Sequence, residues 1–135
     1  MRVIVNVSII NILEGISEKA YPYEACALLI GNMQGEDVII RYVEEVYNAD
    51  RSSTSFSVRP EDLVRVYEHA KGINLDVVGI FHSHPYSKAH PSSKDLRYMS
   101  INQVPWLILS LLNREVRAFI YYNGKVKELD MVITP

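Results

Sequence analysis

The sequence predicts an α/β protein in which helices pack on both faces of a mixed β-sheet. Segments with helical periodicity alternate along the chain with short apolar segments that are typical of strands. The segment DVVGIF, residues 76–81, is apolar on both faces, as expected for a central strand that is covered on both sides. Two pairs of strand-like segments are separated by short turn sequences and are expected to form hairpins.

The first part of the chain is expected to hold a short strand, a helix and a hairpin. Residues 8–19 form the expected amphipathic helix, which Pro22 ends. Its apolar residues recur at helical spacing: Ile9, Ile10, Leu13 and Ile16. Residues 24–31 and 38–48 have strand composition, and the turn residues in GNMQGED between them predict a hairpin.

The middle of the chain is expected to hold a loop and a second helix. Residues 48–55, NADRSSTS, are polar and predict a loop, and Phe56 and Val58 resume an extended segment. Pro60 occupies the first position of a helix, where its missing N–H does no harm, and Gly72 ends that helix.

The last part of the chain is expected to hold one helix and three strands. Residues 92–101 begin with a Ser-x-x-Asp capping pattern and predict a helix. Residues 104–112, VPWLILSLL, predict a strand. Residues 117–131 predict a hairpin in which Asn123-Gly124 suits a type I′ turn.

Composition limits the class of protein. With 135 residues the chain is expected to form a single domain, 1–135, which can bury a core without a disulfide or a structural metal. A net charge of −2 provides no bulk attraction for nucleic acid or anionic lipid, so neither is expected as a partner. The single cysteine, the lack of a clear signal-peptide cleavage site and the lack of a membrane-length apolar run favour a cytoplasmic location.

The stretch HSHPYSKAHPSSKD, residues 82–95, follows the predicted central strand and suggests a metal site. Alternate residues of a strand point to the same side, so His82 and His84 can present two imidazoles to one ion while Ser83 points away. Asp95, near the start of the next helix, can supply an oxygen as third ligand. Three protein ligands and one open position are typical of catalytic rather than structural zinc.

These residues resemble the JAMM (MPN-plus) metalloprotease family. The family pattern is a distant glutamate, then H-[ST]-H-P, and then S-x-x-D, with seven residues between the second histidine and the serine. Glu24 in YEACALLIG, the HSHP sequence and Ser92-x-x-Asp95 match it. The stretch between them also matches, at Asn48, Phe56 and Pro60. The resemblance extends from about Tyr21 to about Leu112.

The resemblance implies a fold, a cofactor and an activity. The fold is the cytidine-deaminase-like JAMM/MPN type, an α-β-α sandwich around a mixed, curved sheet. One zinc ion per chain would be held by His82, His84 and Asp95, with Glu24 as the catalytic general base and the Ser92 hydroxyl stabilising the oxyanion. Active members of the family are isopeptidases that remove ubiquitin or ubiquitin-like modifiers, and the modifier's extended tail is expected to bind as an added strand.

Other functions remain open at this point. A hydrolase that releases cysteine or a peptide from a ubiquitin-fold sulfur-carrier protein would have the same site. Two histidines and a carboxylate also form the facial triad of Fe(II) oxygenases, but those enzymes usually have all-β folds. Zinc deaminases bind their metal with a related set of ligands, but the sequence has no P-C-x-x-C, which excludes the deaminase signature. A non-catalytic scaffold is disfavoured because every ligand position is filled, and a homodimer is left open.

Several residues near these motifs are given ordinary interpretations. Cys26 is expected to be a buried packing thiol, because no base remains to activate it. His90 matches no ligand position and is expected to face solvent or substrate, and His69 is expected to be exposed on its helix. Residues 48–56 are the candidate for a mobile flap over the substrate groove.

Overall fold

The computed structural model describes residues 1–135, and every helix and strand expected from the sequence is present. The elements are β1 (Arg2–Asn6), α1 (Val7–Ala20), β2 (Cys26–Gln34), β3 (Asp37–Val46), α2 (Pro60–Gly72), β4 (Asp76–His84), α3 (Ser93–Met99), β5 (Trp106–Ser110), β6 (Val116–Tyr122) and β7 (Lys125–Thr134). The predicted α/β class with a mixed, curved sheet is therefore confirmed. None of the three helices has the length and apolar character needed to cross a membrane.

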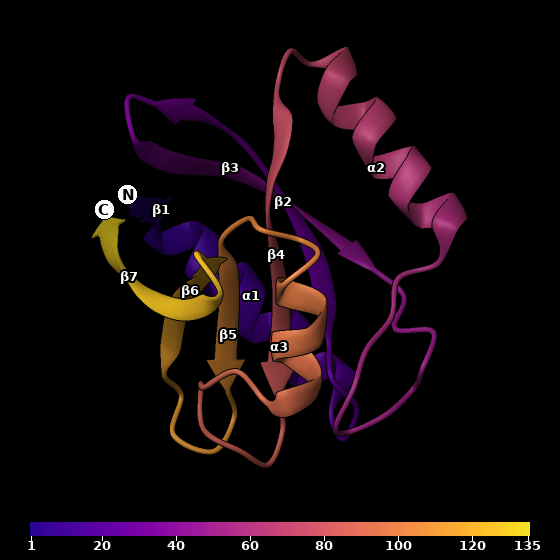
Figure 1. Ribbon diagram of the computed structural model, residues 1–135. Coiled ribbons are helices and arrows are strands. Elements are labelled where there is room, and N and C mark those ends of the chain that lie inside the picture. Colours follow the sequence, from indigo (N-terminus) through magenta and orange to yellow (C-terminus); the bar gives the residue numbers. More distant parts are fainter.

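The seven strands form one sheet in the order β1-β3-β2-β4-β5-β6-β7. β4 pairs with β5 in parallel, and β1 pairs in parallel with both β3 and β7, whereas the other pairs are antiparallel. Because β1, the first strand in this order, also pairs with β7, the last, the curved sheet closes on itself. The same pairing places the first strand of the chain beside the last (Figure 1).

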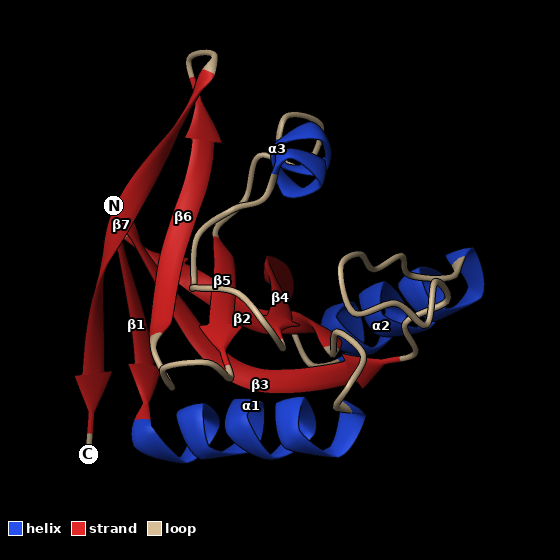
Figure 2. Cartoon of the chain, turned by 90° about the horizontal axis from the view of Figure 1, so that it is seen from below, coloured by secondary structure: helices blue, strands red, loops and turns tan.

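Helices cover the two faces of the sheet and create two apolar cores. α1 lies on one face, where Ile9, Leu13 and Ile16 pack against the sheet. α3 lies over the opposite face and α2 is placed to one side of it (Figure 2). Val66 of α2 and Met99 of α3 belong to this second core, which also contains Trp106.

Two features of the hairpins explain why the chain needs glycine there. Asn123 and Gly124 both have positive φ, 52° and 77°, as the predicted type I′ turn requires. Gly31 lies where the β2–β3 register shifts, and a Cβ at this position would collide with the Ile39 carbonyl oxygen. Only glycine therefore fits at position 31 without displacing β3.

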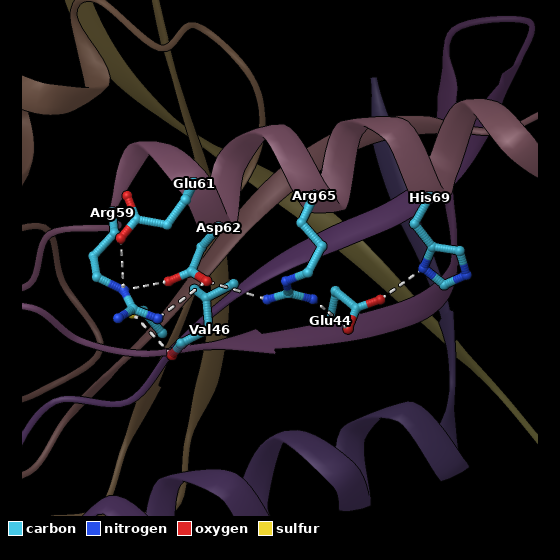
Figure 3. Close-up of polar contacts among 8 residues, drawn as sticks. Glu44, Val46, Arg59, Glu61, Asp62, Arg65 and His69 are labelled. Atoms are coloured by element: carbon cyan, nitrogen blue, oxygen red, sulfur yellow. Dashed lines mark hydrogen bonds and ion pairs between the residues drawn. The ribbon is translucent and has the colours of Figure 1, made fainter.

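A row of ion pairs and hydrogen bonds connects α2 to β3 (Figure 3). Glu44 of β3 lies 2.8 Å from His69 Nδ1 and 3.5 Å from an Arg65 nitrogen. Asp62, which is buried, accepts a hydrogen bond from Arg59 at 2.8 Å and one from Arg65 at 3.4 Å. His69 is thus exposed, as expected, but it also contacts β3. The row fixes the helix that follows the loop 48–56 relative to the strand that precedes it.

Candidate metal centre

Strand β4 continues through His84, so both histidines lie within the strand rather than after it. The alternation of the strand places both imidazoles on one side, with their Nε2 atoms 3.1 Å apart. His82 is fully buried and His84 is 3% exposed. The strand thus delivers two nitrogen donors to one buried point.

Asp95 reaches the same point from α3. Its Oδ2 lies 3.1 Å from His82 Nε2 and 3.0 Å from His84 Nε2. A capping box orients this side chain, because the Ser92 N–H donates to Asp95 Oδ2 and the Asp95 N–H donates to Ser92 Oγ, at 2.9 and 3.1 Å. The start of the helix therefore fixes the position of the carboxylate.

The protonation of the three side chains follows from their surroundings. Burial raises the pKa of Asp95, but hydrogen bonds with His82 and His84 outweigh this and hold it well below its usual range. Burial lowers the pKa of His82. The pKa of His84 is raised, since its bonds to Asp95 and the Lys88 carbonyl outweigh its burial. Asp95 is therefore an anion at neutral pH.

A hydrogen bond also selects which nitrogen of His84 faces the site. His84 Nδ1 lies 2.8 Å from the Lys88 carbonyl oxygen, which can only accept, so Nδ1 carries a proton. In the neutral ring, Nε2 then has a free lone pair directed at Asp95 and His82. This is the arrangement usual for metal-ligating histidine, in which the second nitrogen is held by a carbonyl or carboxylate.

His82 is held by aromatic packing instead. The Phe56 ring stacks on it with centroids 4.7 Å apart, and Trp106 meets it edge-on at 5.7 Å. His82 Nδ1 is buried without any hydrogen-bond partner. The orientation of this imidazole therefore depends on the two aromatic rings.

Glu24 lies beside the three side chains, in the short segment before β2. The strand was expected to begin at Glu24, but it begins at Cys26, so this part of the prediction was wrong by two residues. Glu24 is 3% exposed, and its Oε1 atom has no hydrogen-bond partner. Burial raises the pKa of Glu24 to about 8, with His84 opposing the shift and Asp95 adding to it. The carboxylate is thus close enough for its charge to interact with the triad.

The remaining expected site residues take different positions. Ser92 is half-buried, and since its oxygen accepts the Asp95 N–H, its own proton is free for another acceptor. His90 is exposed and lies 2.7 Å from an Arg117 nitrogen, away from the triad. The Cys26 thiol donates to the Val46 carbonyl, and burial raises its pKa to about 12, which fits a packing thiol rather than a nucleophile.

The donor set of the triad suits a divalent metal ion. Its ligand atoms, from His82, His84 and Asp95, all lie within 4.8 Å of one another. Two nitrogen lone pairs and a carboxylate oxygen held this close together in a buried site are unfavourable unless a positive charge lies between them. Tetrahedral zinc, with ligands at about 2.0–2.2 Å, separates them by roughly 3.3 Å, close to the distances found here. The residues present therefore fit a zinc ion.

The fold and the site together define a JAB/MPN-type α/β protein. The chain belongs to the Prok-JAB family, the prokaryotic homologs of the JAB domain, whose family model matches residues 9–121. The resemblance to JAMM proteins is thus confirmed.

Relatives with known names and structures support this assignment. The chain is 32% identical to a desampylase from Pyrococcus furiosus over 110 residues, covering 82% of this chain and 76% of that protein. It is 24% identical to the CysO-cysteine peptidase of Mycobacterium tuberculosis over 128 residues, covering 93% and 86%. The solution structure of a Desulfitobacterium hafniense protein superposes with a TM-score of 0.88 at 27% identity, covering 99% of this chain and 93% of that one.

Proposed function

We propose that the protein is a zinc-dependent isopeptidase that hydrolyses the bond after the C-terminal Gly-Gly of a ubiquitin-like modifier. The observation that carries this proposal is the convergence of His82, His84 and Asp95 within 4.8 Å, beside the buried Glu24. The similarity to a desampylase supports the substrate class. On this proposal residues 1–135 act as one catalytic domain, and the buried lone cysteine suits the reducing cytoplasm.

The roles of the side chains follow from their chemistry. A zinc ion bound by His82, His84 and Asp95 would lower the pKa of a water molecule to about 7 and polarise the scissile carbonyl. Glu24 takes a proton from the attacking water and gives it to the departing amine. Its unpaired Oε1 is free to accept that proton.

Ser92 is proposed to stabilise the developing oxyanion. Its hydroxyl oxygen is already used as acceptor for the Asp95 N–H, so the hydroxyl proton points elsewhere and is available to a substrate oxygen. The capping box fixes Ser92 and Asp95 relative to each other. Such preorganised donors stabilise transition states strongly because they need no reorientation during the reaction.

A hollow of about 460 Å³ beside Glu24 is the proposed binding place for the modifier tail. Its lining includes the aromatic residues Tyr21, Tyr23 and Tyr47 and the end of β3. An extended chain lying there would run past the end of a strand whose backbone can provide hydrogen bonds. The narrow Gly-Gly end of a modifier would then reach Glu24.

A second candidate reaction is the release of cysteine or a peptide from a ubiquitin-fold sulfur-carrier protein. The similarity to a CysO-cysteine peptidase over 93% of this chain favours it. The same metal, base and oxyanion donor would serve both reactions, because in each case an amide after a modifier tail is hydrolysed. Only the leaving group differs.

The deciding experiment measures metal-dependent cleavage of two substrates of the same ubiquitin-like modifier, one linked to a lysine side chain and one to cysteine. Wild type, chelator-treated protein, zinc-restored protein and Glu24→Gln are compared, with His90→Asn as matched control. Cleavage by wild type and His90→Asn alone, restored by zinc, is expected. Absence of cleavage of both substrates by zinc-loaded wild type would refute the proposal, and preference for the cysteine substrate would favour the second reaction.

A further inference from the structure

The position of Glu24 is determined by its backbone rather than by its carboxylate. Oε1 makes no hydrogen bond, so no partner on the side-chain side holds the group in place. Glu24 also lies outside the regular ladder, which ends at the Cys26–His82 pair. A base that must meet its proton within a fraction of an ångström therefore needs another means of support.

The hydroxyl of Ser83 provides that support on one side of Glu24. The Ala25 N–H donates to Ser83 Oγ at 2.8 Å, and the Ser83 N–H donates to the Ala25 carbonyl at 3.0 Å. The strands thus stay joined for one residue beyond the Cys26–His82 pair, with a side-chain oxygen as the acceptor. Ala25 is 4% exposed and Ser83 is fully buried, so water cannot replace this acceptor.

The loop 48–57 supports Glu24 on the other side. The Glu24 N–H donates to the Ser52 carbonyl at 2.8 Å, and Asn48 Nδ2 donates to the Glu24 carbonyl at 3.0 Å. Asn48 also donates to the Ser55 carbonyl and accepts from the Ser57 N–H, so one buried amide organises the loop around Glu24. With these bonds, Ser83 is the side chain that connects Glu24's segment directly to the metal-binding strand.

Ser83 lies between the two proposed ligands. Because neighbouring strand residues point to opposite faces, His82 and His84 face the metal site while the Ser83 hydroxyl faces Ala25. The tripeptide His82-Ser83-His84 therefore presents its two imidazoles on one face of β4. Its Ser83 hydroxyl, on the other face, holds the segment that carries Glu24. Ser83 therefore sets the spacing between the metal site and the base from the side of β4, while the loop 48–57 supports Glu24 from the other side.

We propose that Ser83 is a positioning residue that holds Glu24 at its working distance from the metal site through the Ala25 N–H. This inference rests on the proposed role of Glu24 as general base. Removing the hydroxyl leaves a buried N–H without an acceptor, so the chain at Ala25 shifts. A misplacement of about 1 Å at a reacting group costs about 100-fold in rate, whereas the ligands, on the opposite face, keep their contacts.

The test compares Ser83→Ala with Ser83→Thr, which retains a hydroxyl oxygen, and with Ser17→Ala as control. Ser17 is equally buried, but its hydroxyl bonds within α1, far along the chain from the site. Ser83→Ala is expected to lower kcat about 10- to 100-fold with little change in KM or in zinc affinity, and to lose hydrogen-exchange protection at the Ala25 amide. Ser83→Thr and Ser17→Ala should behave as wild type.

A double variant separates positioning from general structural damage. In a Glu24→Gln background the Ser83→Ala change should have no further effect on the residual rate, because the group it positions is already inactive. An equal loss in both backgrounds, or full activity with an unprotected Ala25 amide, would overturn the inference. If Ser83→Ala does not fold, Ser83→Cys, with a longer and weaker acceptor, takes its place and should show the same pattern at smaller size.

The inference and the proposed function fail in distinguishable ways. If Glu24→Gln cleaves as fast as wild type, or zinc-loaded wild type does not cleave, the proposed function falls and the inference falls with it. If wild type and Glu24→Gln behave as expected but Ser83→Ala retains its rate, only the role of Ser83 is lost.

Discussion

Phe56 stacks on His82, with ring centroids 4.7 Å apart and 25° between the planes. The two residues come from different elements, since Phe56 ends the loop 48–56 and His82 lies in β4. The loop, which the sequence suggested as a flap, is therefore anchored at one end on a proposed metal ligand. Any opening of this loop has to break that contact or pivot on it.

Phe56→Leu is expected to weaken zinc binding about 10- to 100-fold, the usual effect of disturbing the groups that orient a ligand. His82 Nδ1 has no hydrogen bond, so the loss of the ring leaves the imidazole free to turn. Competition with a chromophoric chelator measures the affinity. Phe119→Leu is the control, because Phe119 belongs to the same core but contacts His90 instead. Equal effects of both changes would show that core packing, not the His82 contact, is responsible.

Zinc is expected to stabilise the wild-type fold. A ligand at 100 times its Kd that binds only the folded state adds about 2.7 kcal/mol, which raises the Tm of a domain of this size by several degrees. His82→Asn should abolish this increase, whereas His90→Asn should retain it, since His90 contacts Arg117 rather than the triad. Thermal unfolding with zinc or with chelator measures both. A retained increase in His82→Asn would show that zinc binds elsewhere.

Asp95→Asn is expected to lower zinc affinity by more than about 100-fold while keeping the helix start intact. The amide oxygen can still accept the Ser92 N–H, so the capping box survives in part. The variant lacks the negative charge that the low pKa of Asp95 maintains in the wild type. Asp76→Asn, at the exposed far end of β4, is the matched control. Metal titration with circular dichroism of the same samples separates lost binding from lost folding.

Glu24→Gln is expected to stabilise the metal-free protein at pH 8 but not near pH 4.5. The folded pKa of about 8 exceeds the ordinary value of 4.5, so between these values the unfolded chain has ionised while the folded one keeps its proton. Unfolding then releases a proton, and wild-type stability falls as the pH rises from 4.5 to about 8. Glutamine does not titrate, so the variant lacks this loss of stability between pH 4.5 and about 8.

The advantage of the variant at pH 8 should be on the order of a few kcal/mol, because the wild type loses stability across every pH unit between its unfolded and folded pKa values. Denaturant unfolding in chelator at both pH values gives the two free energies. Identical pH dependence for wild type and variant would mean that Glu24 is solvated in the folded protein.

Ser92→Ala is expected to have two separable effects. Loss of the oxyanion donor should lower kcat about 10²–10³-fold, and loss of the cap of α3 should lower stability by about 0.5–2 kcal/mol. Ser92→Thr, which keeps the hydroxyl, should restore both, and Ser93→Ala at the exposed neighbouring position should change neither. Full activity in a folded Ser92→Ala protein would remove Ser92 from the reaction.

The sequence determined the secondary structure and the chemistry available to the site. Proline, glycine and hydrophobic period act locally, so they predicted α2 from Pro60 to Gly72 and the Asn123-Gly124 turn as the structure has them. The spacing of His82 and His84 predicted two imidazoles on one face for the same reason, because strand alternation needs only neighbouring residues.

The tertiary structure decided what depends on distant pairing. The parallel pairing of β1 with β7 joins the first and last strands of the chain and closes the sheet, and no local pattern specifies such a partner. The ring of Phe56 on His82 and the hydroxyl of Ser83 on the Ala25 N–H likewise join segments far apart in sequence. The sequence supplied Glu24, Ser83 and His82 as residues, and only folding decided that the residue next to Glu24 would be hydrogen-bonded to the strand that carries the other two.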